Sequence, residues 1–195
     1  MKKDDILILL RSPSTVFTTR DVALLWSEPD ADIVKRKLYR YHKTGKIYAI
    51  RKGIYAKDKN YNKFELANKI FTPSYISFET VLAKAGVIFQ YYERIFLASY
   101  LSLEIKVDCQ TYVYMKIKDS ILTDLTGIEK TDGFYIASPE RALLDVIYLN
   151  KDYYFDHLDN IDWEKAEKIL PIYGNSRQMK NTIAKYRQAA QKESK

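Results

Sequence analysis

The polar residues best suited to chemistry with a partner are basic side chains that share one side of a helix-like stretch. Lysine is a compact point charge that suits a phosphate oxygen, whereas the planar fork of arginine matches the edge of a guanine base. A tyrosine among them can donate a hydrogen bond to a phosphate or pack on a sugar. The candidates for binding double-stranded DNA are Lys35, Arg36, Tyr39, Arg40 and Lys43, followed by Arg51 and Lys52.

The basic excess of the chain is confined to its first third. Residues 1–70 hold 16 Lys and Arg against 8 Asp and Glu, a balance of +8, whereas residues 71–195 hold 16 against 17. A basic module joined to a near-neutral one indicates a polyanion partner for the first. The alternative is a lysine-rich surface that contacts only solvent, and charge alone does not separate the two.

Helices are expected to position these residues. Residues 4–11 and 16–26 carry apolar side chains at helical spacing. Within the second stretch, Thr18 and Asp21 have the T-x-x-D form of a capping box, in which each side chain bonds the backbone N–H of the other residue. Pro29 disfavours helical backbone at the preceding residue, so we expect this helix to end just before it.

The third expected helix, residues 31–44, carries the basic face. Asp30 is a good N-cap and Gly45 a good terminator. An apolar stripe at helical spacing predicts the buried side, and the basic residues fall on the other side. The stripe consists of Val34, Leu38 and Tyr41.

Residues 46–57 read as a hairpin, because two short β-rich runs flank the basic turn Arg51-Lys52-Gly53. Helices followed by a basic helix and a basic-tipped hairpin are typical of a winged helix-turn-helix. In that fold the third helix enters the major groove, and the hairpin reaches the backbone or the minor groove. A winged helix that contacts another protein instead of DNA is the alternative.

The rest of the chain predicts a mixed α/β domain, so the fold class is α/β (α+β) with domains at 1–60 and 64–195. Residues 58–63 form a polar linker, and Phe64, Ala67 and Ile70 give residues 64–71 one apolar face. Strands are expected over 95–117 and 134–136, where β-branched and aromatic residues gather. Helical patterns occupy 77–85, 138–147, 162–169 and 177–192.

The helix that begins at Ser138 is well specified. Ser138 is its N-cap, Pro139 suits the first helical position and Glu140 lies in the first turn. Arg141 and Asp145 are four residues apart and are expected to form an ion pair on one helix face. A functional role for Glu140, Arg141 or Asp145 is the less favoured alternative.

No pattern of a catalytic or metal site stands out, so neither an enzyme nor a cofactor is predicted. Cys109, the single cysteine, cannot form an internal disulfide and fits a reducing cytoplasm, and His42 and His157 lack metal-ligand spacing. Glu104 and Lys106 have the acid-x-Lys form of metal-dependent nucleases, yet chance alone yields about three such triplets at this composition. The N-terminal residues do not resemble a signal peptide, and no apolar run is long enough to span a membrane.

Taken together, these stretches resemble the AbiEi family, the antitoxins and regulators of bacterial type IV toxin–antitoxin (abortive infection) loci. The resemblance spans roughly residues 4–150. It is carried by Phe17-Thr18-Thr19-Arg20-Asp21-Val22, Leu38-x-x-Tyr41-x-x-x-Gly45-Lys46-Ile47, Arg51-Lys52-Gly53-Ile54-Tyr55, Tyr75-Ile76-Ser77-Phe78-Glu79-Thr80-Val81-Leu82 and Ala137-Ser138-Pro139-Glu140-Arg141-Ala142-Leu143-Leu144-Asp145.

The resemblance implies that the N-terminal winged helix binds operator DNA and represses transcription of its own operon. It implies an antitoxin activity in the C-terminal domain against a nucleotidyltransferase-like toxin, which such an antitoxin need not contact. The DNA-facing positions that it carries over are Lys35, Arg36, Tyr39, Arg40, Arg51 and Lys52. Monomeric, dimeric and cooperative binding on DNA all remain open at this point.

Overall fold

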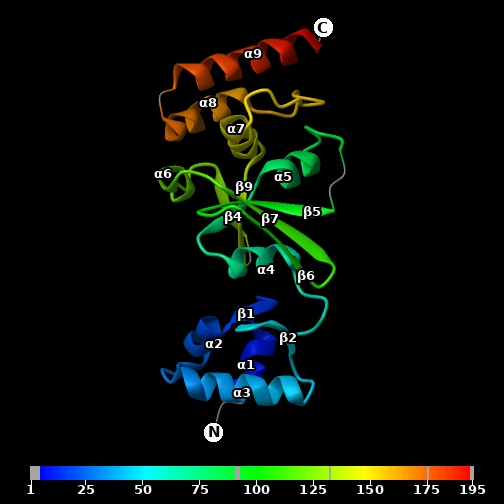
Figure 1. The fold of residues 1–195 in the computed structure, drawn as a ribbon, viewed down its shortest axis with the longest axis vertical. Coiled ribbons are helices and arrows are strands. Elements are labelled where there is room, and N and C mark those ends of the chain that lie inside the picture. The colour runs from blue at the N-terminus through cyan, green and yellow to red at the C-terminus, as the bar shows by residue number, and fades with distance from the viewer. Residues whose placement is uncertain (1–4, 91–92, 132, 175, 194–195) are drawn as a thin grey trace. The chain divides into compact units, whose positions relative to one another are not determined.

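The computed structural model describes residues 5–90, 93–131, 133–174 and 176–193. The chain is α+β and divides into two compact units, each with its own sheet (Figure 1). Unit 1 comprises Met1–Thr72 with Val107–Cys109 and Asp132–Phe134, and unit 2 comprises Pro73–Lys106, Gln110–Thr131 and Tyr135–Lys195. None of the described helices combines the length and apolar character needed to cross a membrane.

Unit 1 combines helices with a small antiparallel sheet. Its helices are α1 (Asp5–Arg11), α2 (Thr19–Trp26), α3 (Ala31–Lys43) and α4 (Lys63–Ile70), and its strands are β1 (Val16–Thr18), β2 (Tyr48–Arg51) and β3 (Ile54–Ala56). The strand order is β1-β3-β2. The predicted helices at 4–11 and 31–44 and the predicted hairpin are confirmed where the structure describes them.

Strand β1 directly precedes α2 and was not predicted, although the start of α2 after its cap Thr18 was. Val16, Phe17 and Thr18 pair antiparallel with residues of β3 about 40 positions later, and α2 begins only after them. Because the pairing partner lies far away in sequence, local periodicity could not reveal this strand. The β-branched and aromatic side chains of the three residues are nevertheless typical of a strand.

The capping box at the start of α2 is confirmed. Its aspartate, Asp21, also forms an ion pair with α4. The backbone N–H of Asp21 donates to Thr18 Oγ1 at 3.1 Å, and the N–H of Thr18 donates to Asp21 Oδ2 at 2.9 Å. Lys69 of α4 pairs with the same carboxylate at 2.7 Å. Burial by itself would raise the pKa of Asp21, but the bonds from Lys69 and Thr18 bring it below its ordinary value.

Helix α4 fully buries only part of the predicted face, together with a neighbouring leucine. Leu66 and Ala67 are fully buried, whereas Phe64 and Ile70 are only half-buried. Glu65 is also buried, and its Oε2 accepts from both the N–H and the hydroxyl of Thr15 at 2.7 Å, which offsets part of the cost of burial. These contacts place α4 in unit 1, so the first unit extends to Thr72, beyond the boundary expected at 60–64.

Unit 2 is built on a mixed six-stranded sheet of order β6-β7-β5-β4-β9-β8. Its strands are β4 (Ser74–Ile76), β5 (Arg94–Ser99), β6 (Leu103–Val107), β7 (Gln110–Lys116), β8 (Ile128–Thr131) and β9 (Phe134–Ala137). β4 runs antiparallel to β5 but parallel to β9, and β5 runs parallel to β7.

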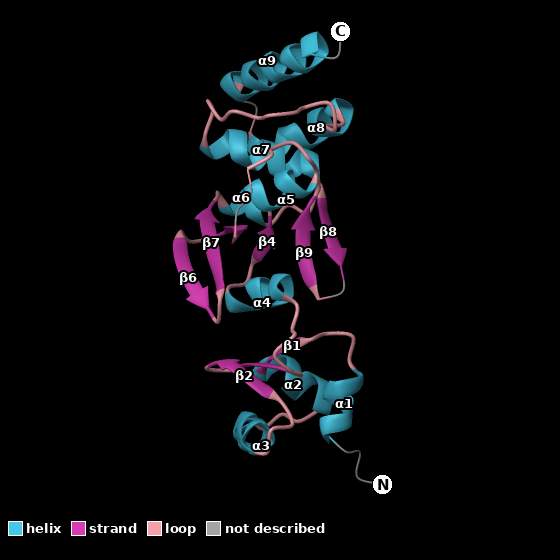
Figure 2. Cartoon of the chain, turned by 90° about the vertical axis from the view of Figure 1, so that its right-hand side faces the viewer, coloured by secondary structure: helices cyan, strands magenta, loops and turns pink. Residues whose placement is uncertain are grey.

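The helices of unit 2 gather at one end of these strands (Figure 2). They are α5 (Phe78–Lys84), α6 (Asp119–Leu122), α7 (Pro139–Leu149), α8 (Trp163–Ile169), the 3-10 helix η1 (Leu170–Tyr173) and α9 (Arg177–Glu193). α7 is the central helix of this layer, since it contacts α5, α8 and α9. Its Ala142, Leu143 and Leu144 are fully buried.

Replacing Asp21 tests how much the shared carboxylate contributes. We expect Asp21→Asn to lower the free energy of unfolding by about 1 kcal/mol at pH 7, because it removes charge-assisted bonds. Since the pKa of Asp21 is lowered in the folded state, its contribution is present above the ordinary value of 3.8 and is lost as the pH falls below it. Urea unfolding followed by circular dichroism from pH 3 to pH 7 measures both effects.

The control is Asp119→Asn, an acid in the first turn of α6. It is expected to change the stability little at any pH. An Asp21→Asn protein whose stability difference from the parent stayed constant down to pH 3 would contradict the assigned role.

Candidate nucleic-acid interface

The five predicted residues of α3 lie on its solvent side. Val34 and Leu38 are fully buried and Tyr41 is 7% exposed, and this stripe fixes the rotation of the helix about its axis. The opposite positions are therefore exposed, with the Tyr39 side chain 60% accessible. The exposed set is Lys35, Arg36, Tyr39, Arg40 and Lys43.

Contacts along α3 distinguish the cations from one another. Lys43 Nζ lies 5.5 Å from the centre of the Tyr39 ring, and the Arg40 guanidinium lies 5.6 Å from that of Tyr41. Such exposed cation–π contacts are weak and leave the charge available to a phosphate. Lys35 forms an ion pair with Asp32 at 3.0 Å, whereas no ion pair to Arg36 or Arg40 is present within the described part of the chain.

Arg51 ends β2 and Lys52 begins the turn to β3, and both are exposed. Gly53, which follows them, has a φ of +78°, a conformation that favours glycine. Its carbonyl accepts from the Thr19 N–H at 3.0 Å and from the Thr19 hydroxyl at 3.3 Å. The basic turn is thereby fastened to the start of α2.

The predicted residues thus form two groups, five on α3 and two where β2 meets the turn, and both groups belong to unit 1. In Figure 2, α3 and β2 lie on the same side of this unit. Among the described residues, no hydrogen bond or ion pair joins the two groups, so each is positioned by its own element.

The exposed cations of unit 1 that were not predicted as site residues include Lys46 and Arg20. Lys46 directly follows the helix terminator Gly45, and its Nζ lies 5.8 Å from the Tyr41 ring centre. Arg20 lies next to Thr19, the residue that holds the basic turn. The sequence placed Arg20 in the first turn of α2. It could not show that this helix start is bonded to the β2–β3 turn, because that bond joins residues far apart in the chain.

The residues weighed for metal or nucleophile chemistry are dispersed. Glu104 and Lys106 are exposed on β6, and the carboxylate of Glu104 pairs with Arg94 at 3.2 Å. Cys109 is exposed, and His157 lies 3.5 Å from Asp159. Over the described residues, no group of three or more His, Cys, Asp and Glu side chains is placed to hold a metal ion.

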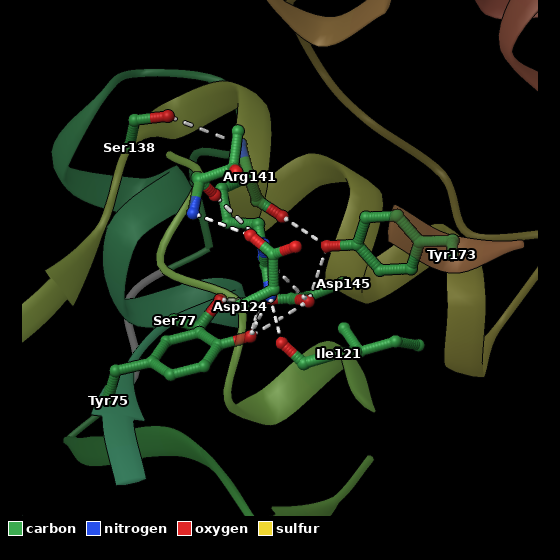
Figure 3. A network of polar contacts seen from close by, with 9 residues as sticks. Tyr75, Ser77, Ile121, Asp124, Ser138, Arg141, Asp145 and Tyr173 are labelled. Atoms are coloured by element: carbon green, nitrogen blue, oxygen red, sulfur yellow. Dashed lines mark hydrogen bonds and ion pairs between the residues drawn. The ribbon is translucent and has the colours of Figure 1, made fainter. Parts of the chain in front are cut away.

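The stretch 138–145 forms the start of α7 and contributes to a buried polar network (Figure 3). Ser138 is the N-cap, as predicted, and its Oγ accepts from the Arg141 N–H at 3.3 Å. The same hydroxyl donates to Glu140 Oε2 at 2.8 Å, and this carboxylate pairs with Lys165 at 2.9 Å. The polar groups of this helix start are thus engaged within unit 2.

Arg141 is wholly enclosed. Its side chain is 0% exposed, and its guanidinium lies between the rings of Tyr75 and Tyr173, 5.4 and 5.3 Å from their centres. It donates to the carbonyls of Thr126 and Ile121 at 2.9 and 2.7 Å and to the Tyr75 hydroxyl at 3.1 Å. The predicted pairing with Asp145 is confirmed, with 3.6 Å between Arg141 Nε and Asp145 Oδ1.

The Asp145 carboxylate is also fully buried and accepts from three hydroxyls. Ser77 Oγ lies at 2.7 Å, Tyr173 Oη at 2.6 Å and Tyr75 Oη at 3.1 Å. Burial raises the pKa of both tyrosines, and the nearby carboxylate raises it further, so the phenols remain protonated donors. Ser77 lies at the N-cap position of α5, but its hydroxyl bonds Asp145 and makes no capping bond.

The network joins β4, α7 and η1 through groups that are closed to solvent. Removal of a single donor therefore leaves a buried carboxylate short of a partner. We expect Tyr173→Phe to lower the free energy of unfolding by about 1–3 kcal/mol, as measured by urea denaturation.

The matched control is Tyr148→Phe, which changes a half-buried ring 5.6 Å from the Tyr173 ring and is expected to have little effect. Equal stability changes in the two variants would argue against a special role for the Tyr173 hydroxyl.

Comparison with known proteins adds no family to this description. No family model and no curated protein matches the chain. A functional assignment therefore depends on the residues and the geometry described above.

Proposed function

We propose that unit 1 is a winged helix-turn-helix that binds double-stranded DNA. In this proposal α3 enters the major groove, and the β2–β3 turn contacts the phosphate backbone or the minor groove. The observation that carries it is the burial of Val34, Leu38 and Tyr41, which turns every predicted polar residue of α3 toward solvent.

The distribution of acids in unit 1 supports the same function. Asp5 pairs with Lys37 at 2.7 Å, Asp21 pairs with Lys69, and Glu65 accepts from Thr15. These carboxylates are occupied by contacts inside the unit. Among the described residues, Lys35 is the one candidate cation with an ion pair, to Asp32, and the others face solvent without one.

The mechanism is electrostatic capture followed by readout in the groove. Lys43 and Lys52 supply point charges to phosphates, and each neutralised phosphate releases counterions, so affinity falls steeply with salt. Arg36 and Arg40 present planar forks that suit guanine O6 and N7. Tyr39, beside Lys43, would donate a hydrogen bond to the phosphate backbone of the DNA.

The broader role rests on the resemblance to the AbiEi family. On that basis we propose a cytoplasmic transcriptional repressor that controls its own toxin–antitoxin operon, with unit 2 as the antitoxin domain. Its functional partner is then a nucleotidyltransferase-like toxin. Dimerisation or cooperative binding on operator DNA belongs to the same proposal.

Fluorescence anisotropy with the duplex directly upstream of the chain's own gene, and with a scrambled duplex, tests DNA binding. We expect Arg36→Ala and Arg40→Ala each to weaken specific binding by about 1–3 kcal/mol and to relax base preference. Lys52→Ala should weaken binding to both duplexes equally and reduce the salt slope by about 1.

Lys180→Ala, which removes an exposed cation of α9 in unit 2, is the control and should leave binding unchanged. Unchanged affinity in all three test variants would overturn the proposal. Absence of DNA binding by the parent protein at low salt, together with stable co-purification of a protein, would favour a protein-interaction module.

A further inference from the structure

An exposed acid interrupts the basic surface of α3. Asp32 lies in the first turn of the helix, one turn before Arg36 on the same side, and its side chain is 78% exposed. The carboxylate therefore lies beside the cations that the proposed function assigns to DNA.

The cap of α3 does not use this carboxylate. Helix capping is performed by Asp30, whose Oδ1 accepts from the N–H groups of Asp32 and Ile33 at 2.8 and 3.2 Å. The contact that Asp32 itself makes is the pair with Lys35, and both side chains are more than half exposed. Surface pairs of this kind contribute little to stability, at most about 1 kcal/mol.

On a surface that binds a polyanion, an acid at this position lowers the binding affinity. It repels phosphates and competes with them for Lys35, so it weakens binding to any sequence. The first turn of a recognition helix, however, contacts base edges rather than phosphates. A carboxylate at a base edge accepts a hydrogen bond from the amino group N4 of cytosine.

The spacing to Arg36 fits a joint readout. Four residues of α-helix advance about 6 Å, which corresponds to about two base steps of B-DNA. Arg36 can therefore bond O6 and N7 of a guanine while Asp32 reaches an amino group one or two base pairs away.

We propose that Asp32 is a specificity-determining residue that accepts a hydrogen bond from a cytosine amino group near the guanine read by Arg36. This inference rests on the proposed DNA-binding function. In the complex Lys35 leaves Asp32 and contacts a phosphate, so the ion pair of the free protein is exchanged for two contacts to DNA. Repulsion by Asp32 at the same time weakens binding to sequences that lack the cytosine.

The experiment selects bound duplexes from a randomised pool with the full-length protein and then measures affinity for a panel of single base-pair substitutions. Three variants are compared with the parent: Asp32→Ala, Asp32→Asn and Glu129→Gln. The last removes an exposed acid of β8 in unit 2 and controls for net charge. Circular dichroism checks that each variant is folded.

We expect Asp32→Ala to lose about tenfold discrimination at one C·G position and to bind scrambled DNA more tightly. Asp32→Asn should shift that position toward adenine, because an amide pairs with adenine N6 and N7. Glu129→Gln should leave both affinity and preference unchanged.

The inference is overturned if both Asp32 variants bind every duplex more tightly by one common factor, since Asp32 would then act only by repulsion. Failure of the parent protein to bind any duplex in the pool would instead overturn the proposed function itself. The two failures are distinguishable because the first requires DNA binding by the parent and the second excludes it.

Discussion

Everything proposed for unit 1 depends on the burial of one apolar stripe on α3. Val34, Leu38 and Tyr41 pack into the core that α1 and α2 complete, together with Phe17 and Val22. Since a helix is a rigid cylinder, fixing one side fixes the direction of every other side chain. The exposed face of α3 is thus set by hydrophobic packing, and the charges that it carries are free to serve recognition.

A different constraint organises unit 2. Its central helix carries an arginine and an aspartate into a region closed to solvent, where protein groups must be their partners. The tyrosine hydroxyls, the Ser77 hydroxyl and two backbone carbonyls supply hydrogen bonds to them, and Arg141 Nε has the Asp145 ion pair alone among the described residues. They come from separate elements, so the requirements of two charges tie β4, the chain around α6, and η1 to α7.

Local sequence signals predicted much of this arrangement. The capping box at Thr18, the cap at Asp30 and the buried stripe of α3 depend on neighbours within a few residues, and all three were predicted correctly. Strand β1 and the buried carboxylate of Glu65 depend on partners about 40 and 50 residues away, which periodicity does not report. For the same reason the pairing of Arg141 with Asp145 was predictable, whereas their enclosure by Tyr75 and Tyr173 was not.

The enclosed pair also bears on how this chain tolerates mutation. Loss of either charge alone leaves its partner buried and uncompensated, so a single-step substitution at Arg141 or Asp145 passes through a poorly folded intermediate. An apolar replacement of both at once is far less disruptive, but it requires two simultaneous changes. The two positions are therefore expected to change together or not at all.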